Sequence, residues 1–393
     1  MSSYWLTRRR GRVASELADH ELLVLFASVS EDGTQLPASD FGYLSDFWEG
    51  NAIFVLSADG HTAMYTDVFE TDKAKWYDPP AISRERLGKR LMLDKLGNLD
   101  DAKRELVAVL ADYTDIYTNF AVCTPHAPHP WLQSLLSDIS RNIKLHDSHD
   151  LLAKFRVVKD QEELARIRRA VGLARDALDY VEMLAPRRDY EYQIAADFSY
   201  WLRGHNSVEA FPTIVAQGSS GGVMHHRKSN HYLTDGEAVL IDAGSRRYGY
   251  CSDITRTIPY RKTFTRQQQE VYYWVKRAKE AVIAAIKPGV DWKYLQDTAD
   301  RCLAEGLIEL GVLSQPLEAV LEQKLFKEYT IHSIGHWLGI DVHDSGDYER
   351  ALLPGMVLTV EPGLYLNSCR AFAGVNVRLE DDVLVTVNGS DIL

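Results

Sequence analysis

Four acidic side chains lie within or directly after apolar runs in the second half of the chain, where a buried strand ordinarily carries hydrophobic residues. Asp242 ends one such run, Asp253 lies inside the next, and Glu361 and Glu380 follow two later runs. Charged groups are rarely buried unless they are paired or bound to a metal, because desolvating an isolated carboxylate costs several kcal/mol. If the four acids converge, they carry a charge of about −4, which two divalent cations neutralise. The sequence therefore predicts a site for a pair of divalent metal ions.

Three histidines, His332, His336 and His343, fall within one stretch of twelve residues. Each imidazole could bind a metal or contact a substrate, and each could instead be an ordinary core or surface histidine. His332 and His336 are spaced like the histidine pair of a zincin helix. However, Ser333 stands where that motif needs its glutamate base, and Gly335 argues against a helix. The zincin motif is therefore incomplete.

A second histidine pair, His225-His226, follows a glycine-rich loop and could bring one imidazole to a substrate oxygen or lie on a surface loop. The loop itself, residues 218–222, fits the G-x-S-x-G pattern of the serine-hydrolase nucleophile elbow, with Ser220 as the nucleophile. That elbow needs a helix directly after it, and residues 223–231 lack helical periodicity. A serine hydrolase is therefore the weakest of the interpretations that rival the metal site.

The elements that must position these residues are long helices and antiparallel strands, an α+β arrangement. Apolar residues recur at helical spacing from Leu164 to Val181, and Asp160 is a suitable N-cap for that helix. A hairpin turning near residues 246–249 would set Asp242 and Asp253 side by side on adjacent strands. Further helices are expected over residues 191–202, 266–286 and 292–310, and strands over 238–242, 250–258, 357–360 and 375–386.

The first part of the chain, residues 1–155, alternates predicted helices and strands and reads as a smaller α/β domain, followed by a second domain over residues 156–393. Its expected strands cover residues 21–28, 52–57 and 62–65, and its expected helices cover residues 5–18, 106–110 and 131–139. Residues 125–130 are expected to form a loop.

The composition is that of an ordinary globular protein, with 44 basic and 56 acidic side chains and a formal net charge of −12. That balance argues against nucleic-acid and anionic-membrane partners, and no apolar stretch is long enough for a membrane helix. The basic run Arg8-Arg9-Arg10 is interpreted as a solvated helix face. The four cysteines are far apart and contain no CxxC pair, so neither a zinc cage nor a disulfide framework is expected. A cytoplasmic protein is expected.

Five motifs in order resemble those of the creatinase/aminopeptidase P/prolidase family of pita-bread metallopeptidases. The resemblance implies a pita-bread catalytic domain of the α+β class, preceded by a smaller α/β domain that the first part of the chain matches only loosely. The chain ends soon after the last motif, where relatives often continue. The matching stretches are residues 240–244, 252–257, 332–344, 354–365 and 377–382.

Carried over motif by motif, the resemblance implies that Asp253 and Glu380 bridge two metal ions, that Asp242 binds one ion, and that His336 and Glu361 bind the other. All five ligand positions are filled, which argues against a non-catalytic binding protein of the same fold. The oxygen-rich ligand set favours Mn²⁺ or Co²⁺ over a thiolate-type zinc site, although Zn²⁺ also fits.

The resemblance further implies that His225, His332 and His343 face the substrate and that Arg378 lies near the metals. Glu361, His343 and His225 are the expected catalytic residues. The implied activity is that of a Xaa-Pro aminopeptidase acting on short proline-containing peptides, with Xaa-Pro dipeptidase (prolidase) activity as the nearest alternative. Either His332 or Trp337 could line a slot for the proline ring or belong to the core. A homodimer or homotetramer is expected by analogy.

Overall fold

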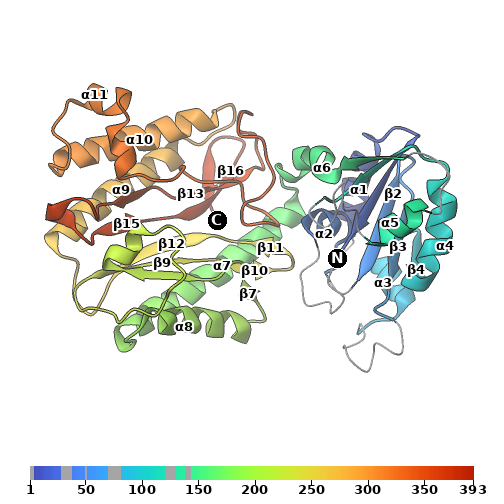
Figure 1. The fold of residues 1–393 in the computed structure, drawn as a ribbon, viewed down its shortest axis with the longest axis horizontal. Coiled ribbons are helices and arrows are strands. Elements are labelled where there is room, and N and C mark those ends of the chain that lie inside the picture. The colour runs from blue at the N-terminus through green and yellow to red at the C-terminus, as the bar shows by residue number, and fades with distance from the viewer. Residues whose placement is uncertain (1–3, 28–37, 49–50, 70–80, 121–129, 138–142) are drawn as a thin grey trace. The chain divides into compact units, whose positions relative to one another are not determined.

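The computed structural model describes residues 4–27, 38–48, 51–69, 81–120, 130–137 and 143–393, and the chain divides into two compact units, Met1–Arg156 and Val157–Leu393 (Figure 1). We propose that these units are the two domains that the sequence predicts. The predicted loop over residues 125–130 and Cys123 fall largely or wholly outside the described residues.

The first unit is built on a mixed sheet with strand order β4-β3-β2-β1-β5-β6. The β1–β2 and β2–β3 pairs are antiparallel, and the β1–β5, β3–β4 and β5–β6 pairs are parallel. Helix α4 buries Ala102, Leu106 and Leu110, one residue per turn, against the sheet. The elements are α1 (Tyr4–Ala14), β1 (Glu21–Phe26), α2 (Ser39–Ser45), β2 (Ala52–Ser57), β3 (Thr62–Thr66), α3 (Arg84–Arg90), β4 (Lys95–Asn98), α4 (Leu99–Leu110), β5 (Asp115–Thr118), α5 (Pro130–Ser137), β6 (Lys144–Asp147) and α6 (Ser148–Arg156).

The interpretation of Arg8-Arg9-Arg10 as a solvated face is wrong for two of the three residues. Arg9 and Arg10 are 4% and 2% exposed. Arg10 donates hydrogen bonds to the carbonyl oxygens of Leu44 (2.7 Å) and Leu91 (2.8 Å), at the ends of two helices. Carbonyl groups at helix C-termini carry partial negative charge and lack helical partners, so they can hold a buried guanidinium.

The helices of the second unit follow the predicted spacing. Asp160 caps α7 (Gln161–Leu184), and its Oδ1 accepts hydrogen bonds from the amides of Glu162 and Glu163, both at 3.0 Å. The predicted N-cap is thereby confirmed. The remaining α-helices are α8 (Glu191–Gly204), α9 (Arg266–Ala285), α10 (Trp292–Glu309) and α11 (Leu317–Glu322).

In Figure 1, strands β9, β12, β13 and β15 of the second unit lie between the helix pair α7 and α8 and the helix pair α9 and α10. All of the strand pairs described here are antiparallel, which confirms the predicted α+β arrangement. The strands are β7 (Val208–Glu209), β8 (Ile214–Gln217), β9 (Ala238–Ala243), β10 (Ser245–Arg247), β11 (Tyr250–Cys251), β12 (Ile254–Pro259), β13 (Val357–Val360), β14 (Gly363–Tyr365), β15 (Asn376–Arg378), β16 (Asp381–Val385) and β17 (Ser390–Ile392).

Two predicted strands are each interrupted at an acidic residue. The run over residues 250–258 breaks at Asp253, and the run over residues 375–386 breaks at Glu380. The Asp253 amide donates to Asp382 Oδ2 (3.0 Å), and the Glu380 amide donates to the Thr255 carbonyl (3.1 Å). Because these amides bond outside the pairs of the adjoining strands, the strand ladder is interrupted at both acids.

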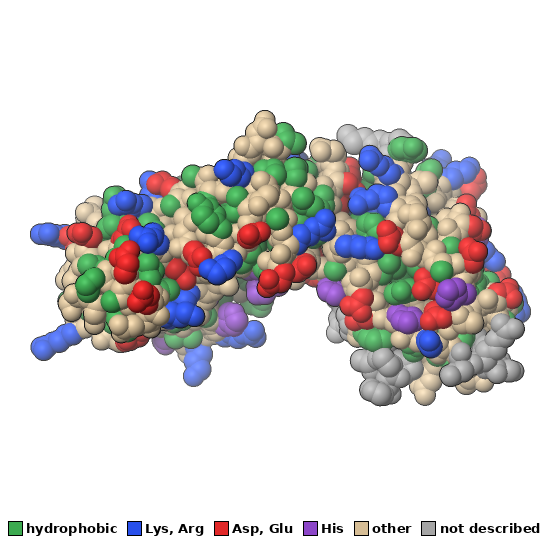
Figure 2. All heavy atoms as spheres, turned by 90° about the horizontal axis from the view of Figure 1, so that it is seen from above, with side chains coloured by type: hydrophobic (Ala, Val, Ile, Leu, Met, Phe, Trp, Pro, Cys, Tyr) green, Lys and Arg blue, Asp and Glu red, His purple; other side chains and the backbone are tan. Residues whose placement is uncertain are grey.

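The surface seen in Figure 2 carries Lys and Arg side chains interspersed with Asp and Glu side chains on both units. Mixed charge of this kind accords with the composition, which argues against a basic binding face. Among the described residues, no helix is long and apolar enough to cross a membrane.

Candidate metal centre

The predicted hairpin between Asp242 and Asp253 is present. Strands β10 and β11 are joined through Tyr248 and Gly249, both with positive φ (51° and 81°), as the type I′ form of a two-residue hairpin turn requires. The register differs from the prediction in one respect, because Asp242 on β9 faces Thr255 on β12. Asp253 directly precedes β12, so the two aspartates are diagonal neighbours.

Four of the predicted ligands converge beside this hairpin. One donor atom each from Asp253, His336 and Glu380 lies within 4.8 Å of the others. His336 Nε2 lies 3.5 Å from Asp253 Oδ2 and 3.6 Å from Glu361 Oε1. These residues come from the start of β12, the loop after α11, the end of β13 and the start of β16, so the fold gathers four distant segments at one point.

The fifth predicted ligand, Asp242, is held by the predicted arginine. Arg378 Nη2 donates to Asp242 Oδ2 at 2.5 Å, and Arg378 is only 2% exposed. Burial lowers the pKa of Arg378, but Tyr365 and Asp242 more than offset that effect and raise it above its ordinary value. The guanidinium therefore stays charged and offsets part of the negative charge of the cluster.

The electrostatics of the clustered acids favour the binding of cations. Burial, and then the neighbouring acids, raise the pKa values of Asp253 and Glu380 well above their ordinary values, and burial raises the pKa of Glu361 to about 7. Asp242 Oδ1 and Asp253 Oδ1 are buried, and neither has a hydrogen-bond partner among the described residues. Buried carboxylate oxygens without partners are costly unless a cation binds them. The donor set therefore fits a pair of divalent cations.

Three supporting residues were not predicted as site residues, although all lie in the motif stretches. Thr255 Oγ1 donates to Glu380 Oε2 at 2.7 Å. Tyr365 contacts both His332 Nε2 (2.7 Å) and Arg378 Nη1 (3.1 Å) through its hydroxyl. Asp382 is buried beside Asp253, and burial raises its pKa to about 8. These residues hold the ligands in place, which a strand pattern alone does not reveal.

The two side chains of the pair His225-His226 differ in their exposure and contacts. His225 is exposed, and together with Asp242, Asp253 and His343 it lines a cavity of about 440 Å³. His226 also borders this cavity, but its side chain is 7% exposed and its Nε2 lies 3.0 Å from Glu191 Oε2. Of the two, His225 is therefore free to contact a substrate.

The ring of His343 lies beside that of the predicted ligand His336, tilted by 45° with ring centroids 4.1 Å apart. Burial lowers the pKa of His343, and the nearby His336 and His225 lower it further. A neutral imidazole keeps one N–H, so His343 can donate one hydrogen bond into the cavity.

His332 and Trp337 differ in their placement. The segment over residues 331–345 contains no helix, as expected from its glycines. His332 Nδ1 lies 3.5 Å from Glu361 Oε2, beside the cluster. Trp337 is fully buried and packs on Trp292, with ring centroids 4.9 Å apart. Of the two interpretations weighed for Trp337, the core position is therefore the correct one.

Gly335 permits the close approach that places His336. A Cβ added at Gly335 would meet the Thr359 carbonyl oxygen at 2.1 Å. We expect Gly335→Ala to destabilise the protein by about 3 kcal/mol and to lower metal affinity, because the backbone before His336 must move. Chemical denaturation and metal titration measure the two effects.

The matched control for that variant is Gly172→Ala, in the middle of α7, where an added Cβ meets nothing within 4 Å. This substitution should stabilise the protein by about 0.5–1 kcal/mol, because alanine favours a helix more than glycine does. Equal effects of the two substitutions would contradict the close packing at Gly335.

The loop with Ser220 does not form a nucleophile elbow. Residues Gly218–Gly222 make a short 3-10 helix, and no α-helix follows directly. Ser220 Oγ lies 2.9 Å from His231 Nδ1, and Glu191 Oε2 lies 3.6 Å from that same nitrogen. A catalytic triad needs the serine and the acid on opposite ring nitrogens, because the imidazole must pass a proton from one side while held on the other.

Ser220→Ala is therefore expected to leave the turnover number within about twofold of the unsubstituted enzyme, since no step depends on its hydroxyl. Steady-state kinetics on a peptide substrate measure this. A loss of turnover of 100-fold or more, in a variant with unchanged metal content, would restore the serine mechanism.

Comparisons with sequence models of protein families and with known proteins indicate the family to which the chain belongs. The sequence model of metallopeptidase family M24 matches residues 165–387. The chain is 30% identical to a Xaa-Pro aminopeptidase from Haemophilus influenzae, over 98% of this chain and 92% of that protein. It is 27% identical to a Xaa-Pro aminopeptidase from Escherichia coli, over 98% of this chain and 93% of that protein.

Solved structures agree with the sequence comparison. Aminopeptidase P from Escherichia coli with the inhibitor Pro-Leu matches with a TM-score of 0.91 at 26% identity, covering 100% of this chain and 94% of that chain. Proline aminopeptidase P II from Yersinia pestis matches with a TM-score of 0.89 at 28% identity, covering 100% and 96%. The predicted pita-bread fold is thereby confirmed.

Proposed function

Because the chain belongs to metallopeptidase family M24, we propose that it is a Xaa-Pro aminopeptidase, which removes the first residue of a peptide whose second residue is proline. The observation that carries this proposal is the convergence of the buried Asp253 and Glu380 with the half-buried His336 and Glu361, and with Asp242 beside them. The names of the similar proteins from Haemophilus influenzae and Escherichia coli support the choice of bond.

In the proposed metal centre, the carboxylates of Asp253 and Glu380 would help to hold both divalent ions, and Asp242, His336 and Glu361 would supply the remaining ligands. When bound, such a pair lowers the pKa of a water toward about 7 and polarises the scissile carbonyl. Mn²⁺ is the proposed ion, with Co²⁺ or Zn²⁺ as alternatives, because four of the five ligands are carboxylates.

The chain's own residues move the protons and bind the developing charge. Glu361 accepts a proton from the attacking water and delivers it to the leaving nitrogen. His343 and His225 donate hydrogen bonds to the carbonyl oxygen as it becomes negative. Arg378 holds Asp242 in position through the 2.5 Å contact.

The choice of a Xaa-Pro bond needs an apolar surface for the proline ring. Such a bond has no N–H and fixes the following φ, so a site that binds an extended peptide through its backbone amides handles it poorly. Phe211, Ile214 and Val342 line the cavity that contains Asp242 and Asp253. We assign the proline ring to this apolar wall. His332, which lies 3.5 Å from Glu361 Oε2 and does not line this cavity, is proposed to contact another part of the substrate.

The nearest alternative is a dipeptidase for Xaa-Pro. The test is an assay of chelator-treated protein with added Mn²⁺, on Xaa-Pro dipeptides and on Xaa-Pro-Xaa tripeptides. We expect no turnover before Mn²⁺ is added and at least tenfold higher kcat/KM for the tripeptides afterwards. Cleavage of dipeptides alone would assign the chain to the dipeptidase class, and cleavage of neither would support a binding protein.

A cytoplasmic location and a homodimer or homotetramer stay predictions. Peptide substrates, without nucleic-acid or membrane partners, are part of the proposal, in keeping with the net charge of −12.

A further inference from the structure

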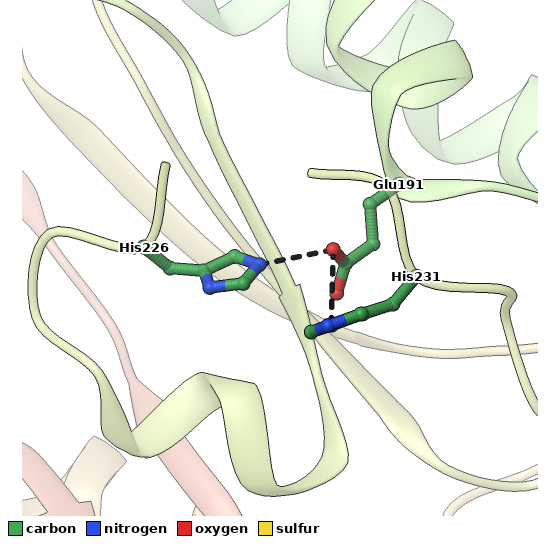
Figure 3. A group of neighbouring side chains, drawn as sticks. All are labelled: Glu191, His226 and His231. Carbon is green, nitrogen blue, oxygen red and sulfur yellow. Dashed lines mark hydrogen bonds and ion pairs between the residues drawn. The ribbon is translucent and has the colours of Figure 1, made fainter. Parts of the chain in front are cut away.

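A second group of metal-type donors lies outside the acid cluster. Glu191, His226 and His231 each offer one donor atom, and these atoms lie within 4.8 Å of one another. Their side chains converge from three segments, with Glu191 at the start of α8 and the two histidines on either arm of the loop before β9 (Figure 3). None of the three is a member of the proposed metal pair.

The carboxylate of this group, that of Glu191, is shielded from solvent and is oriented by a backbone hydrogen bond. Glu191 is 0% exposed. Its Oε1 accepts a hydrogen bond from the Gln217 amide at 3.0 Å, which leaves Oε2 directed at both histidines. His226 Nε2 lies 3.0 Å and His231 Nδ1 lies 3.6 Å from Oε2. The bond from the backbone amide orients the carboxylate in the way that outer hydrogen bonds orient metal ligands.

The spacing of these atoms matches a shared ion. Zinc–nitrogen and zinc–oxygen bonds of about 2.0–2.1 Å in tetrahedral geometry place neighbouring ligand atoms about 3.3–3.4 Å apart. The distances from Glu191 Oε2 to His226 Nε2 (3.0 Å) and to His231 Nδ1 (3.6 Å) lie on either side of that value. His231 is exposed, so one side of the group is open to water. Ser220 Oγ, 2.9 Å from His231 Nδ1, stands at this open side.

We propose that Glu191, His226 and His231 bind a single divalent transition-metal ion, with the chemistry of Zn²⁺, separate from the catalytic pair. Two imidazoles and one carboxylate are donors that this class of ion prefers over the hard cations Mg²⁺ and Ca²⁺. Water or the Ser220 hydroxyl completes the coordination.

The ion would join α8 to both arms of the loop before β9. His226 directly follows His225, which lines the cavity of the proposed active site. An ion bound by Glu191, His226 and His231 therefore restrains the backbone that carries His225. This ion, which is additional to the catalytic pair, has a structural role beside the substrate cavity.

The test counts zinc on the full-length chain after chelation, incubation with Zn²⁺ and removal of free metal, by mass spectrometry of the metal. It is done on the unsubstituted chain and on Glu380→Ala, which lacks the proposed pair. In both backgrounds we expect His231→Ala and Glu191→Gln to hold one zinc fewer per chain. His231→Ala alters an exposed side chain, and Glu191→Gln keeps the shape of Glu191, so both variants are expected to fold.

The matched control is His205→Ala. His205 is also exposed, in the same unit, and its Nδ1 bonds only locally, to the Trp201 carbonyl at 2.8 Å. This variant should keep the zinc count of its parent. A Zn²⁺-dependent rise in Tm should also appear in Glu380→Ala and vanish in Glu380→Ala/His231→Ala. The proposal is overturned if His231→Ala and His205→Ala hold equal zinc and show the same Zn²⁺-dependent rise in Tm.

Discussion

Replacement of Glu380 by alanine is expected to remove both catalytic metal ions and to lower kcat/KM by roughly three orders of magnitude or more. Glu380 is 2% exposed, and a donor atom of its carboxylate lies within 4.8 Å of those of Asp253 and His336. In the proposed centre Glu380 would help to hold both ions, so its loss would weaken the binding of each. The pair then has too few carboxylates to balance its charge.

Metal analysis and steady-state kinetics on a proline-containing tripeptide measure the two effects together. The control is Glu349→Ala, which removes an exposed carboxylate from the same unit and should change neither quantity. Full activity in the Glu380→Ala variant would refute the ligand assignment. Loss of activity with two ions still bound would instead give Glu380 a role in the chemistry and not in metal binding.

Glu361→Gln is expected to lower kcat by about 10²–10⁴-fold while KM changes little, because the amide cannot carry the proton from water to the leaving nitrogen. The substitution keeps the size of the side chain and one oxygen donor. Glu361 lies 3.6 Å from His336 Nε2 and 3.5 Å from His332 Nδ1, so its oxygens face both a ligand and a substrate-side imidazole. This position suits a group that both binds metal and moves protons.

The Glu361→Gln experiment needs metal content beside kinetics, since weaker metal binding alone also lowers the rate. We expect kcat to stay low at saturating Mn²⁺. Recovery of kcat to near the original value at high Mn²⁺ would show that Glu361 serves only as a ligand. Glu322→Gln, an exposed glutamate in α11, is the matched control and should leave kcat unchanged.

The sequence by itself determined the elements whose signals are local. The helix from Gln161 to Leu184 was predictable because its apolar residues repeat at helical spacing and Asp160 caps it. The same holds for the acids. Asp242, Asp253, Glu361 and Glu380 could be proposed as metal ligands from the sequence because a buried carboxylate in an apolar run is costly without a cation.

Only the tertiary structure decided features that depend on partners far apart in the chain. The burial of Arg10 rests on carbonyl groups 34 and 81 residues away, and the contact of Arg378 with Asp242 joins residues 136 positions apart. Likewise, His226 turns inward to contact Glu191, 35 residues away, and this leaves the neighbouring His225 exposed in the lining of the cavity. Local spacing fixes which face of a helix or strand a residue occupies, but the packing of distant segments fixes what that face meets.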